Sequence, residues 1–600
     1  MLLRQILVSK LKNLRWLDLS HNSQLSLSNT NNVSLFLPNL GSLSCSSCNI
    51  SEFSDFVRNL EGLEVLDLSY NRINVIEADM FSKLKNLWRL DLSYNSELSL
   101  STNLSLPLPS LETLLLSSCN TTEFPHFLRT LEKLFLLDLS NNSIHGKISM
   151  GQSEGWPSLT SLDLSNNFLR DIEYYPWKNL QILNVRSNQL GGSLLVPPPS
   201  TRVFLISKNR LRGQLPSSIC SLNSLEILDL SDNNLSGTFP TCLGAFSDGL
   251  SILDLHRNNF HGNIPDSFVK GNVLQTINLS NNDLDGPLPK SLMNCSMLEV
   301  LNVGNNKIND TFPHWLGALP ELKVFVLRSN NFHGQINNSN IGSSFPNLRI
   351  FDLSRNEFSG SLPTCFESFN SMMASADVVV RYMGDRRAYY HDSVVVTMKG
   401  VDVKFERILT IFTAIDLSSN LFGGEIPEIV GKLSSLQVLN FSHNNLTGYI
   451  PSTMGNMTEL ESLDLSSNKL VGKIPTQLAG LRFLEVLNLS QNQLIGPIPL
   501  GNQFNTFLND SYSGNLGLCG FPLSERCGET QPGSPLFYEE ADSESGFEWK
   551  AALMGYGSGL VIGISIRYII FTLGKPKWLV KMVGRAGHKL NRHCRGLRNL

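Results

Sequence analysis

Leucines recur along the chain in one template, LxxLxLxxN, found in stretches such as "LEVLDLSYN", "LSILDLHRN" and "LESLDLSSN". Nineteen copies occur, 15 within residues 1–365 and four within 409–500, and most are spaced 23 to 26 residues apart. The xLxLx part alternates with period 2, which predicts a short strand with its leucines on one face. One such strand cannot bury its leucines, so we expect the copies to stack as a solenoid with a parallel sheet over a continuous core.

The asparagine that ends the template is expected to be a buried amide that hydrogen-bonds to the backbone of neighbouring coils. Two copies carry Cys48 and Cys119 at this position. A thiol fills the same volume with far fewer hydrogen bonds, so we interpret both cysteines as structural.

The period is lost between Asn356 and Asn420, where about 40 extra residues separate two copies. We call residues 366–408 the island. The runs "VVVTM" and "VDVKF" on either side of its residues 399 and 400 predict a β-hairpin. Arginines and tyrosines gather there, a composition typical of binding hot spots, and a disordered loop is the alternative. The candidate binding residues of the island are Arg381, Tyr382, Arg386, Arg387, Tyr389, Tyr390 and Lys399.

Residues that depart from the template's Asp or Asn and Ser on the exposed face of the sheet are further binding candidates, although each can be an ordinary solvated residue. An aromatic patch near the start consists of Trp16, Tyr70, Trp88 and Tyr94. A basic track in the middle consists of Arg186, Lys208, His256, Arg257, Arg328 and Arg355. Together they favour a ligand of acidic character. Sequons at Asn278, Asn440 and Asn488 fall on the same face.

Composition narrows the function classes. The net charge is −4 with 17% charged residues, which gives no electrostatic footprint for nucleic acid. The ten cysteines lack zinc-type spacing, and no catalytic constellation is recognised, so we expect a non-enzyme without cofactor or metal. Cys220 and Cys242 occupy similar places in adjacent coils and are a candidate disulfide. Glycosylation candidates are Asn32, Asn103, Asn234, Asn309, Asn445 and Asn509; no sequon follows the last of these, which favours an extracellular repeat region.

Residues 551–573 form an apolar run with one charge, long enough to cross a bilayer as a helix. An acidic segment, 529–550, precedes it, and a basic tail, 574–600, follows it, so the positive-inside rule places the C-terminus in the cytosol. The tail is too short for a kinase domain. Gly555, Gly559 and Gly563 recur every four residues and predict a face for helix–helix association in the membrane.

The tail of the template, as in "NLTGYIP" and "NQLIGPIP", resembles the plant-type leucine-rich repeat. The order of the last 300 residues also resembles plant receptor-like proteins of the disease-resistance type. The quoted features are "LNVGNNKINDTFPHWLGALPELKVFVLRSNNFHG", the island, four repeats, "GNQFNTFLNDSYSGNLGLCGFPL", an acidic stretch, a glycine-rich membrane helix and "GKPKWLVKMV".

This resemblance implies a kinase-less, single-pass type I receptor of the plasma membrane with a plant-type repeat superhelix and extracellular repeats. It also implies a peptide, protein or glycan ligand of pathogen origin, an adaptor leucine-rich-repeat receptor kinase at the glycine face, and a recruited co-receptor kinase. It further implies a C-terminal cap at 501–528 closed by a Cys519–Cys527 disulfide. Without a leader or an N-terminal cap at its start, the chain is expected to be a truncated form. An extracellular inhibitor of a microbial wall-degrading enzyme and a developmental peptide receptor are the alternatives.

Overall fold

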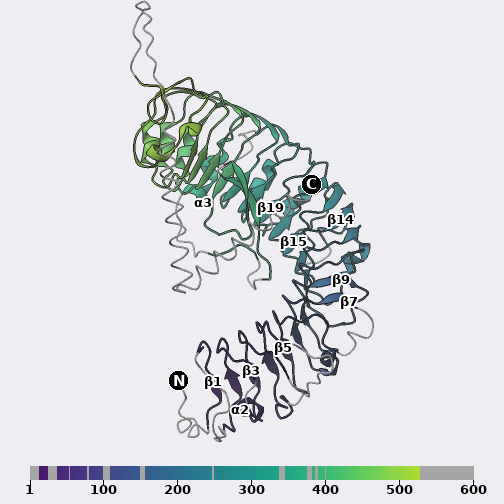
Figure 1. The fold of residues 1–600 in the computed structure, drawn as a ribbon. Helices are drawn as coiled ribbons and strands as arrows, with labels where there is room; N and C mark the ends of the chain where they lie inside the picture. The colour runs from purple at the N-terminus through teal and green to yellow at the C-terminus, as the bar shows by residue number, and fades with distance from the viewer. Residues whose placement is uncertain are drawn as a thin grey trace, which may run out of the picture. The chain divides into compact units, whose positions relative to one another are not determined.

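The computed structural model describes residues 13–23, 37–52, 55–76, 80–98, 108–148, 156–245, 249–336, 345–373, 381–384, 389–398 and 400–527 (Figure 1). The chain divides into two units at residues 528 and 529. Several predicted features lie outside the described residues: Asn32, Asn103, Arg386, Arg387, Lys399, the glycines Gly555, Gly559 and Gly563, and the segments 529–550, 551–573 and 574–600. Within the described ranges, none of the helices has the length and apolar character needed to span a bilayer.

One parallel sheet of nineteen three-residue strands runs through the described part of the first unit, one strand for each predicted repeat. Each strand pairs in register with the next in chain order, and β22 pairs directly with β26, so the island interrupts the sequence but not the sheet. The predicted solenoid with a parallel sheet is confirmed. The strands are β1 (Trp16–Asp18), β2 (Ser42–Ser44), β3 (Val65–Asp67), β4 (Arg89–Asp91), β5 (Thr113–Leu115), β6 (Leu136–Asp138), β8 (Ser161–Asp163), β10 (Ile182–Asn184), β11 (Val203–Leu205), β13 (Ile227–Asp229), β15 (Ile252–Asp254), β17 (Thr276–Asn278), β19 (Val300–Asn302), β20 (Val324–Val326), β22 (Ile350–Asp352), β26 (Ala414–Asp416), β28 (Val438–Asn440), β30 (Ser462–Asp464) and β32 (Val486–Asn488).

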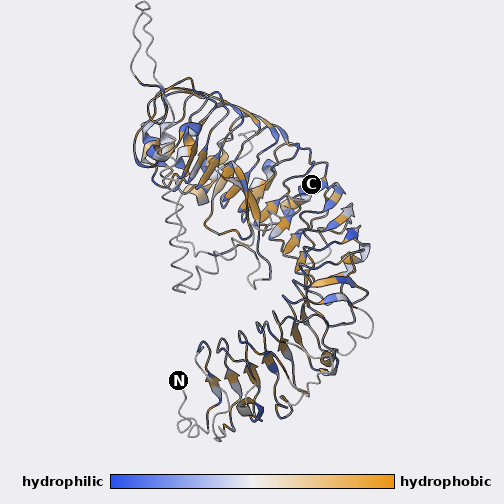
Figure 2. Cartoon of the chain, viewed as in Figure 1, coloured by the Kyte–Doolittle hydropathy of each residue, from blue (hydrophilic) through white to orange (hydrophobic). Residues whose placement is uncertain are grey.

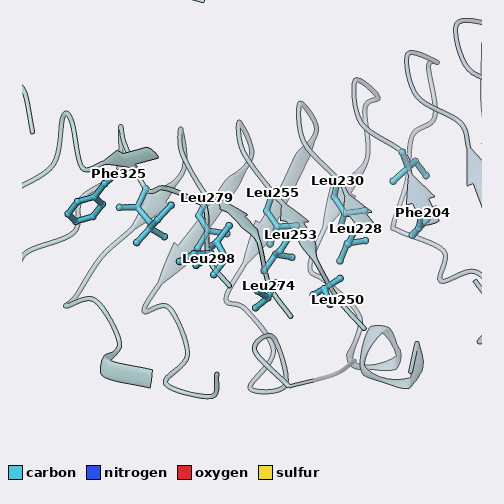
Figure 3. Close-up of a cluster of buried hydrophobic side chains, with 14 of the residues drawn as sticks. Phe204, Leu228, Leu230, Leu250, Leu253, Leu255, Leu274, Leu279, Leu298 and Phe325 are labelled. Carbon is cyan, nitrogen blue, oxygen red and sulfur yellow. The ribbon is translucent and has the colours of Figure 1, made fainter. Parts of the chain in front are cut away.

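The central residue of each strand points into the core, as period-2 alternation requires. Figure 3 shows leucines of successive coils, among them Leu228, Leu253 and Leu279, lying between the strands and the loops opposite. Figure 2 shows that the strands of the middle repeats are the most hydrophobic part of these coils. The first and third residues of each strand lie on the other face of the sheet, which we call the concave face.

The remaining elements are short and complete each coil. Small parallel pairings follow the sheet strands: β7 (His145–Ile148) with β9 (Phe168–Ile172); β12 (Arg212–Gly213), β14 (Asn234–Gly237), β16 (Asn259–Gly262) and β18 (Asp283–Leu284); β21 (His333–Gln335), β23 (Glu357–Ser361), β27 (Leu421–Glu425) and β29 (Asn445–Thr447); and β31 (Val471–Gly472), β33 (Gln493–Pro497) and β34 (Gly517–Cys519). The α-helices are α2 (Asp55–Arg58) and α3 (Asn370–Met373). The 3-10 helices are η1 (His126–Thr130), η2 (Ser217–Ser221), η3 (Lys290–Asn294), η4 (His314–Ala318), η6 (Thr364–Ser368), η7 (Glu428–Lys432), η8 (Ser452–Asn456), η9 (Thr476–Gly480), η10 (Asn502–Thr506) and η11 (Asn509–Ser511).

The template asparagines form the expected ladder of buried amides. Asn233 is typical: its side-chain amide donates to the carbonyls of Ile206, Leu230 and Ser231, and its Oδ1 accepts the N–H of Leu211. The ladder therefore ties each coil to both neighbours.

The two cysteines at the ladder position behave as its substitutes. The Cys119 thiol donates to the Leu92 carbonyl at 3.1 Å, while its own N–H donates to Oδ1 of Asn142 in the next coil. Cys48 makes the equivalent bonds to Leu19 and Asn71. Both are buried and free, and burial raises the pKa of the Cys119 thiol to about 12. This fits a packing role rather than a reactive one.

The structure joins Cys519 to Cys527, the pairing that the resemblance implies, and Cys220 to Cys242 on adjacent coils.

The island begins later in the chain than the sequence predicts. Phe366, Phe369 and Met372 are buried in the repeat core, so the insertion begins after Met373. The physical reason is that the coil completes its apolar loop before the chain departs.

Candidate functional site

The described part of the island forms a small folded unit. Its hairpin consists of β24 (Val394–Met398) and β25 (Val401–Phe405), paired antiparallel in continuous register. Gly400 has φ 69°, a left-handed conformation that suits glycine at the turn. Two isolated bridges, Gly384 to His391 and Tyr382 to Leu409, tie the first leg of the island to the hairpin base. The predicted hairpin is therefore present.

The island packs its apolar side chains onto the concave face of the sheet. Met383, Val394, Val396 and Ile408 from the island form one buried cluster with concave-face residues of β19 to β28: Val300, Val324, Val326, Ile350, Ala414 and Val438. Tyr390 forms a second cluster with β11 to β15: Val203, Leu205, Ile227 and Ile252. The first residue of each sheet strand from β11 to β28 is apolar except Thr276, whose hydroxyl bonds to the island, and the island covers these positions.

Polar contacts clamp the first leg of the island to β13, β15 and β17. The Tyr390 hydroxyl donates to Asp254 Oδ2 at 2.6 Å, and the Thr276 hydroxyl donates to Asp392 Oδ1 at 2.9 Å. Arg186 donates to the Tyr389 carbonyl at 2.9 Å and, through its other nitrogens, to Asp229 Oδ2 at 2.7 and 3.0 Å.

A second clamp holds the hairpin over β20 and β22. Arg328 is almost fully buried and donates to both carboxylate oxygens of Asp402 at 3.0 Å and to the Val395 carbonyl at 3.3 Å. Its guanidinium also lies 3.5 Å from Asp352. The half-exposed Arg355 reaches the same Asp402 at 3.3 Å. One hairpin carboxylate therefore bridges two arginines of adjacent coils.

Burial and charge act together at these clamps. Burial favours a raised pKa at Asp229, but the Arg186 guanidinium and the hydroxyls of Ser231 and Ser207 outweigh it and hold that pKa below its ordinary value. Burial disfavours the charged form of His256, yet Asp254, bonded to its Nδ1 at 2.7 Å, holds the pKa of His256 above its ordinary value. The paired group therefore favours the charged form at both residues.

Asp392 has the opposite balance. Its carboxyl is buried between the island and the sheet, and burial raises its pKa to about 7, with the Thr276 hydroxyl the main opposing contact. Burial thus costs its ionised form more free energy than its neutral form.

The structure gives the predicted basic track a different role. Arg186, Arg328 and His256 are engaged with carboxylates, the first two also with the island, so they are not free to bind an acidic ligand, and that interpretation does not hold for them. Arg355 and the exposed Arg257 also have carboxylate partners, Asp402 and Asp232. Lys208 is exposed. The track is largely neutralised within the chain.

The predicted island residues divide in the same way. Tyr390 is buried and holds the island in place. Arg381 and Tyr382 are exposed, and the Arg407 guanidinium lies 5.5 Å from the Tyr382 ring centre. Tyr389 is half-buried. The outer surface of the island therefore presents Arg381 and Tyr382.

A cavity of about 130 Å³ opens between the hairpin tip and the concave face of β28, β30 and β32. It is lined by Thr397, Gly400, Asn440, Ser462, Asp464, Val486 and Asn488. Five of the seven lining residues have polar side chains, with Asp464 as the one carboxylate, although the exposed surface is more apolar than polar. This cavity is a site that neither the island nor the repeats could form alone.

The aromatic patch lies on the concave side of the first repeats. Tyr70 and Tyr94 stack with ring centres 4.1 Å apart, and both are exposed. Trp88 and Trp16 are also exposed, Trp16 at 81%.

Among the glycosylation candidates that the structure describes, Asn234, Asn309, Asn445 and Asn509 are exposed. The concave sequon residues Asn278 and Asn440 are buried, so a glycan there is incompatible with this packing.

The residues that sequence reasoning missed are the acids and hydroxyls of the clamps: Asp254, Thr276, Asp392 and Asp402. Asp254 sits at a template position and looks like consensus, so its own identity carries no signal. A signal did exist at the first position of the sheet strands from β11 to β28, where every residue except Thr276 is apolar. An apolar stripe on the outer face of a sheet indicates that something covers it.

Two leucine-rich-repeat family models match the chain, one at residues 38–96, 61–121, 109–169, 248–308, 412–470 and 451–494 and the other at 224–246 and 347–369. Among solved structures, the Arabidopsis receptor kinase HAESA in complex with the peptide hormone IDA and the co-receptor SERK1 is 26% identical, with a TM-score of 0.57, and the match covers 84% of this chain and 91% of that chain. The plant peptide hormone receptor RGFR1 in complex with RGF2 shares the fold, with a TM-score of 0.58 at 23% identity over 80% of this chain and 79% of that chain.

Sequence relatives cover more of the chain. Receptor-like protein 7 of Arabidopsis thaliana is 48% identical over 552 residues, which is 88% of this chain and 56% of that protein. Receptor-like protein 32 of Arabidopsis thaliana is 43% identical over 526 residues, which is 85% of this chain and 58% of that protein. The chain thus spans less than two thirds of the length of these relatives. The chain belongs to the plant leucine-rich-repeat receptor-like proteins.

Proposed function

We propose that the chain is part of a cell-surface receptor that binds an extracellular, pathogen-derived ligand with its island and repeats. The observation that carries this proposal is the composite surface of hairpin and concave face, with the cavity beside Gly400. Peptide- or protein-sized ligands are favoured, because the similar receptor kinase HAESA is found in complex with a peptide hormone and a co-receptor. The four repeats after the island are the platform for the co-receptor kinase.

The cavity offers a direct test. Val486 is half-buried in its wall, so Val486→Trp should fill the cavity, while Val486→Thr keeps its size. Each variant is expressed in leaves and challenged with microbial culture filtrates to which the parent chain responds with an oxidative burst. We expect the response to be lost in the tryptophan variant and kept in the threonine variant, at equal delivery to the cell surface. A full response from both variants would rule out ligand binding in this cavity.

Signalling is proposed to run through the membrane segment. Residues 551–573 cross the plasma membrane once, with the repeats outside, and Gly555, Gly559 and Gly563 contact an adaptor receptor kinase, because small residues let helices approach closely. Arg567 occupies the next position of this four-residue repeat, and we propose that it crowds the cytosolic end of the glycine face. Gly559→Leu should therefore weaken co-precipitation with the adaptor kinase, and Arg567→Gly should strengthen it. Unaltered co-precipitation of Gly559→Leu would exclude the glycine face as the contact with the adaptor kinase.

A further inference from the structure

A single column of side chains runs along the concave face at the third strand position. In the first repeats this column is acidic: Asp18, Asp67, Asp91, Asp138 and Asp163 occupy it in β1, β3, β4, β6 and β8. Ser44 of β2 and Leu115 of β5 interrupt this column, so the acids on neighbouring strands, about 4.8 Å apart, are the pairs Asp67–Asp91 and Asp138–Asp163. We call this set the acidic column.

Each carboxylate of the acidic column is held in place but not neutralised. One oxygen accepts the N–H of the serine two residues later, at 2.8 to 3.0 Å. Within the part of the chain that the structure describes, none of the five forms an ion pair, and Arg89 is the one basic strand residue beside them. Burial raises the pKa of Asp91 and of Asp138, and the stacked neighbours Asp67 and Asp163 add to this. The acidic column therefore presents carboxylates with which no basic side chain of the described residues forms an ion pair.

Further along the sheet, the same column shows which groups it accepts. Asp229 binds the Arg186 guanidinium at 2.7 Å, Asp352 lies 3.5 Å from that of Arg328, and Asp254 accepts the Tyr390 hydroxyl. These carboxylates are buried, whereas those of the acidic column are partly or fully exposed. The same backbone register supports both sets. Beneath the island, carboxylates at this position thus bind guanidinium and phenol groups. The strands β1 to β8 lie outside the stretch that the island covers.

Exposed aromatic side chains flank the acidic column. The stacked Tyr70 and Tyr94 follow β3 and β4, and Trp88 and Phe135 precede β4 and β6, all at least 38% exposed. Aromatic faces attract cations, and Arg more often than Lys. Stacked acids between aromatic rings are complementary to arginine side chains, which pair with carboxylates in a fork and also stack on rings.

We propose that the acidic column and the Tyr70–Tyr94 pair form a second docking surface, which binds an arginine-rich segment of a polypeptide partner. The partner's guanidinium groups take the places that Arg186 and Arg328 occupy over the middle repeats. This surface is separate from the island and its cavity, and it stands whether or not the cavity binds a ligand. It also reverses the charge that the basic track suggested for a partner on this face.

The test uses the full chain purified in detergent micelles and three labelled probes: hexa-arginine, hexa-glutamate and cellohexaose. The key variant is Asp91→Asn with Asp138→Asn, because Asn302 and Asn278 occupy the same column position and show that the fold accepts asparagine there. The matched control is Glu61→Gln with Glu132→Gln, which removes two exposed charges outside the strands. Both variants change the net charge equally.

Hexa-arginine should bind the parent chain, and the column variant should weaken that binding by roughly five- to tenfold, as expected for two exposed ion pairs. The control should change it by less than about twofold, and Tyr70→Ser with Tyr94→Ser should weaken it by about threefold. Equal losses in column variant and control would overturn the proposal, since the attraction would then be general. Preferential binding of hexa-glutamate, or of cellohexaose without hexa-arginine, would overturn it as well.

Discussion

Tyr390 provides a clean test of whether the island is held by its clamps. Tyr390→Phe keeps the ring and its packing against Val203, Ile227 and Ile252 but removes the hydroxyl that donates to Asp254 at 2.6 Å. A hydrogen bond to a charged group contributes about 1.5–3 kcal/mol. Since each 1.4 kcal/mol is a factor of about ten in an equilibrium constant, the equilibrium for release of the island should rise by roughly 10- to 100-fold.

The assay is hydrogen exchange of island amides that are bonded when the island is docked, such as Met383 N–H to the Ile408 carbonyl. Under conditions where exchange reports the opening equilibrium, their protection should fall by that factor, while amides of the sheet strands β3 to β5 keep theirs. Tyr382→Phe is the matched control, because Tyr382 is half-exposed and its ring contact with Arg407 does not need the hydroxyl.

Equal protection in the parent chain and in Tyr390→Phe would refute the reasoning, since the hydroxyl would then contribute nothing to docking. An equal fall in Tyr382→Phe would refute it too, because the effect would not be specific to the clamp.

Further predictions concern protonation, the amide ladder and the cap. Burial raises the pKa of Asp392 from an ordinary 3.8 to about 7 when the island is docked, so docking takes up a proton. Docking of the island should therefore weaken as the pH rises from about 4 to 7, by at most roughly 4 kcal/mol. Asp392→Asn should flatten the pH profile of hydrogen exchange in the island. Asn233→Ala leaves the Leu211 N–H unpaired and removes one of two donors from the carbonyls of Ile206, Leu230 and Ser231, so it should destabilise its coils by about 1–3 kcal/mol. Asn233→Cys should cost less, and both variants are measured by amide exchange in β11 and β13. Removing the Cys519–Cys527 disulfide, which closes an eight-residue separation, should cost about 2–3 kcal/mol locally, measured at the Ile498 amide bonded to Cys519; unchanged exchange there would contradict it.

The covered stripe on the concave face has a consequence for deletion experiments. A receptor without residues 376–404 would expose Val300, Val324 and Ile350, which are almost fully buried beneath the island. Loss of response in such a deletion would therefore mix loss of the binding surface with exposure of apolar area. The single substitutions at Val486 and Tyr390 avoid this difficulty.

The sequence by itself determined the solenoid. Each repeat contacts only its neighbours, so a local pattern repeated nineteen times specifies strand, core leucine and amide ladder without knowledge of distant residues. Cys48 and Cys119 were readable for the same reason, since their role depends on one position in the template. The hairpin was readable because its two strands and its turn are adjacent in sequence.

Only the tertiary structure decided what the island covers and which charges remain free. Arg186 meets the Tyr389 carbonyl 203 residues away, and Tyr390 meets Asp254 across 136. Such pairs exist only after the coils have stacked and brought their concave positions into one column. From sequence, Arg186, Arg328 and His256 are simply basic residues on a face, and charge alone does not say whether a partner within the chain already neutralises it. The acids of β1 to β8 read as consensus for the same reason, and only the folded chain shows that the island covers β11 to β28 and leaves these acids open.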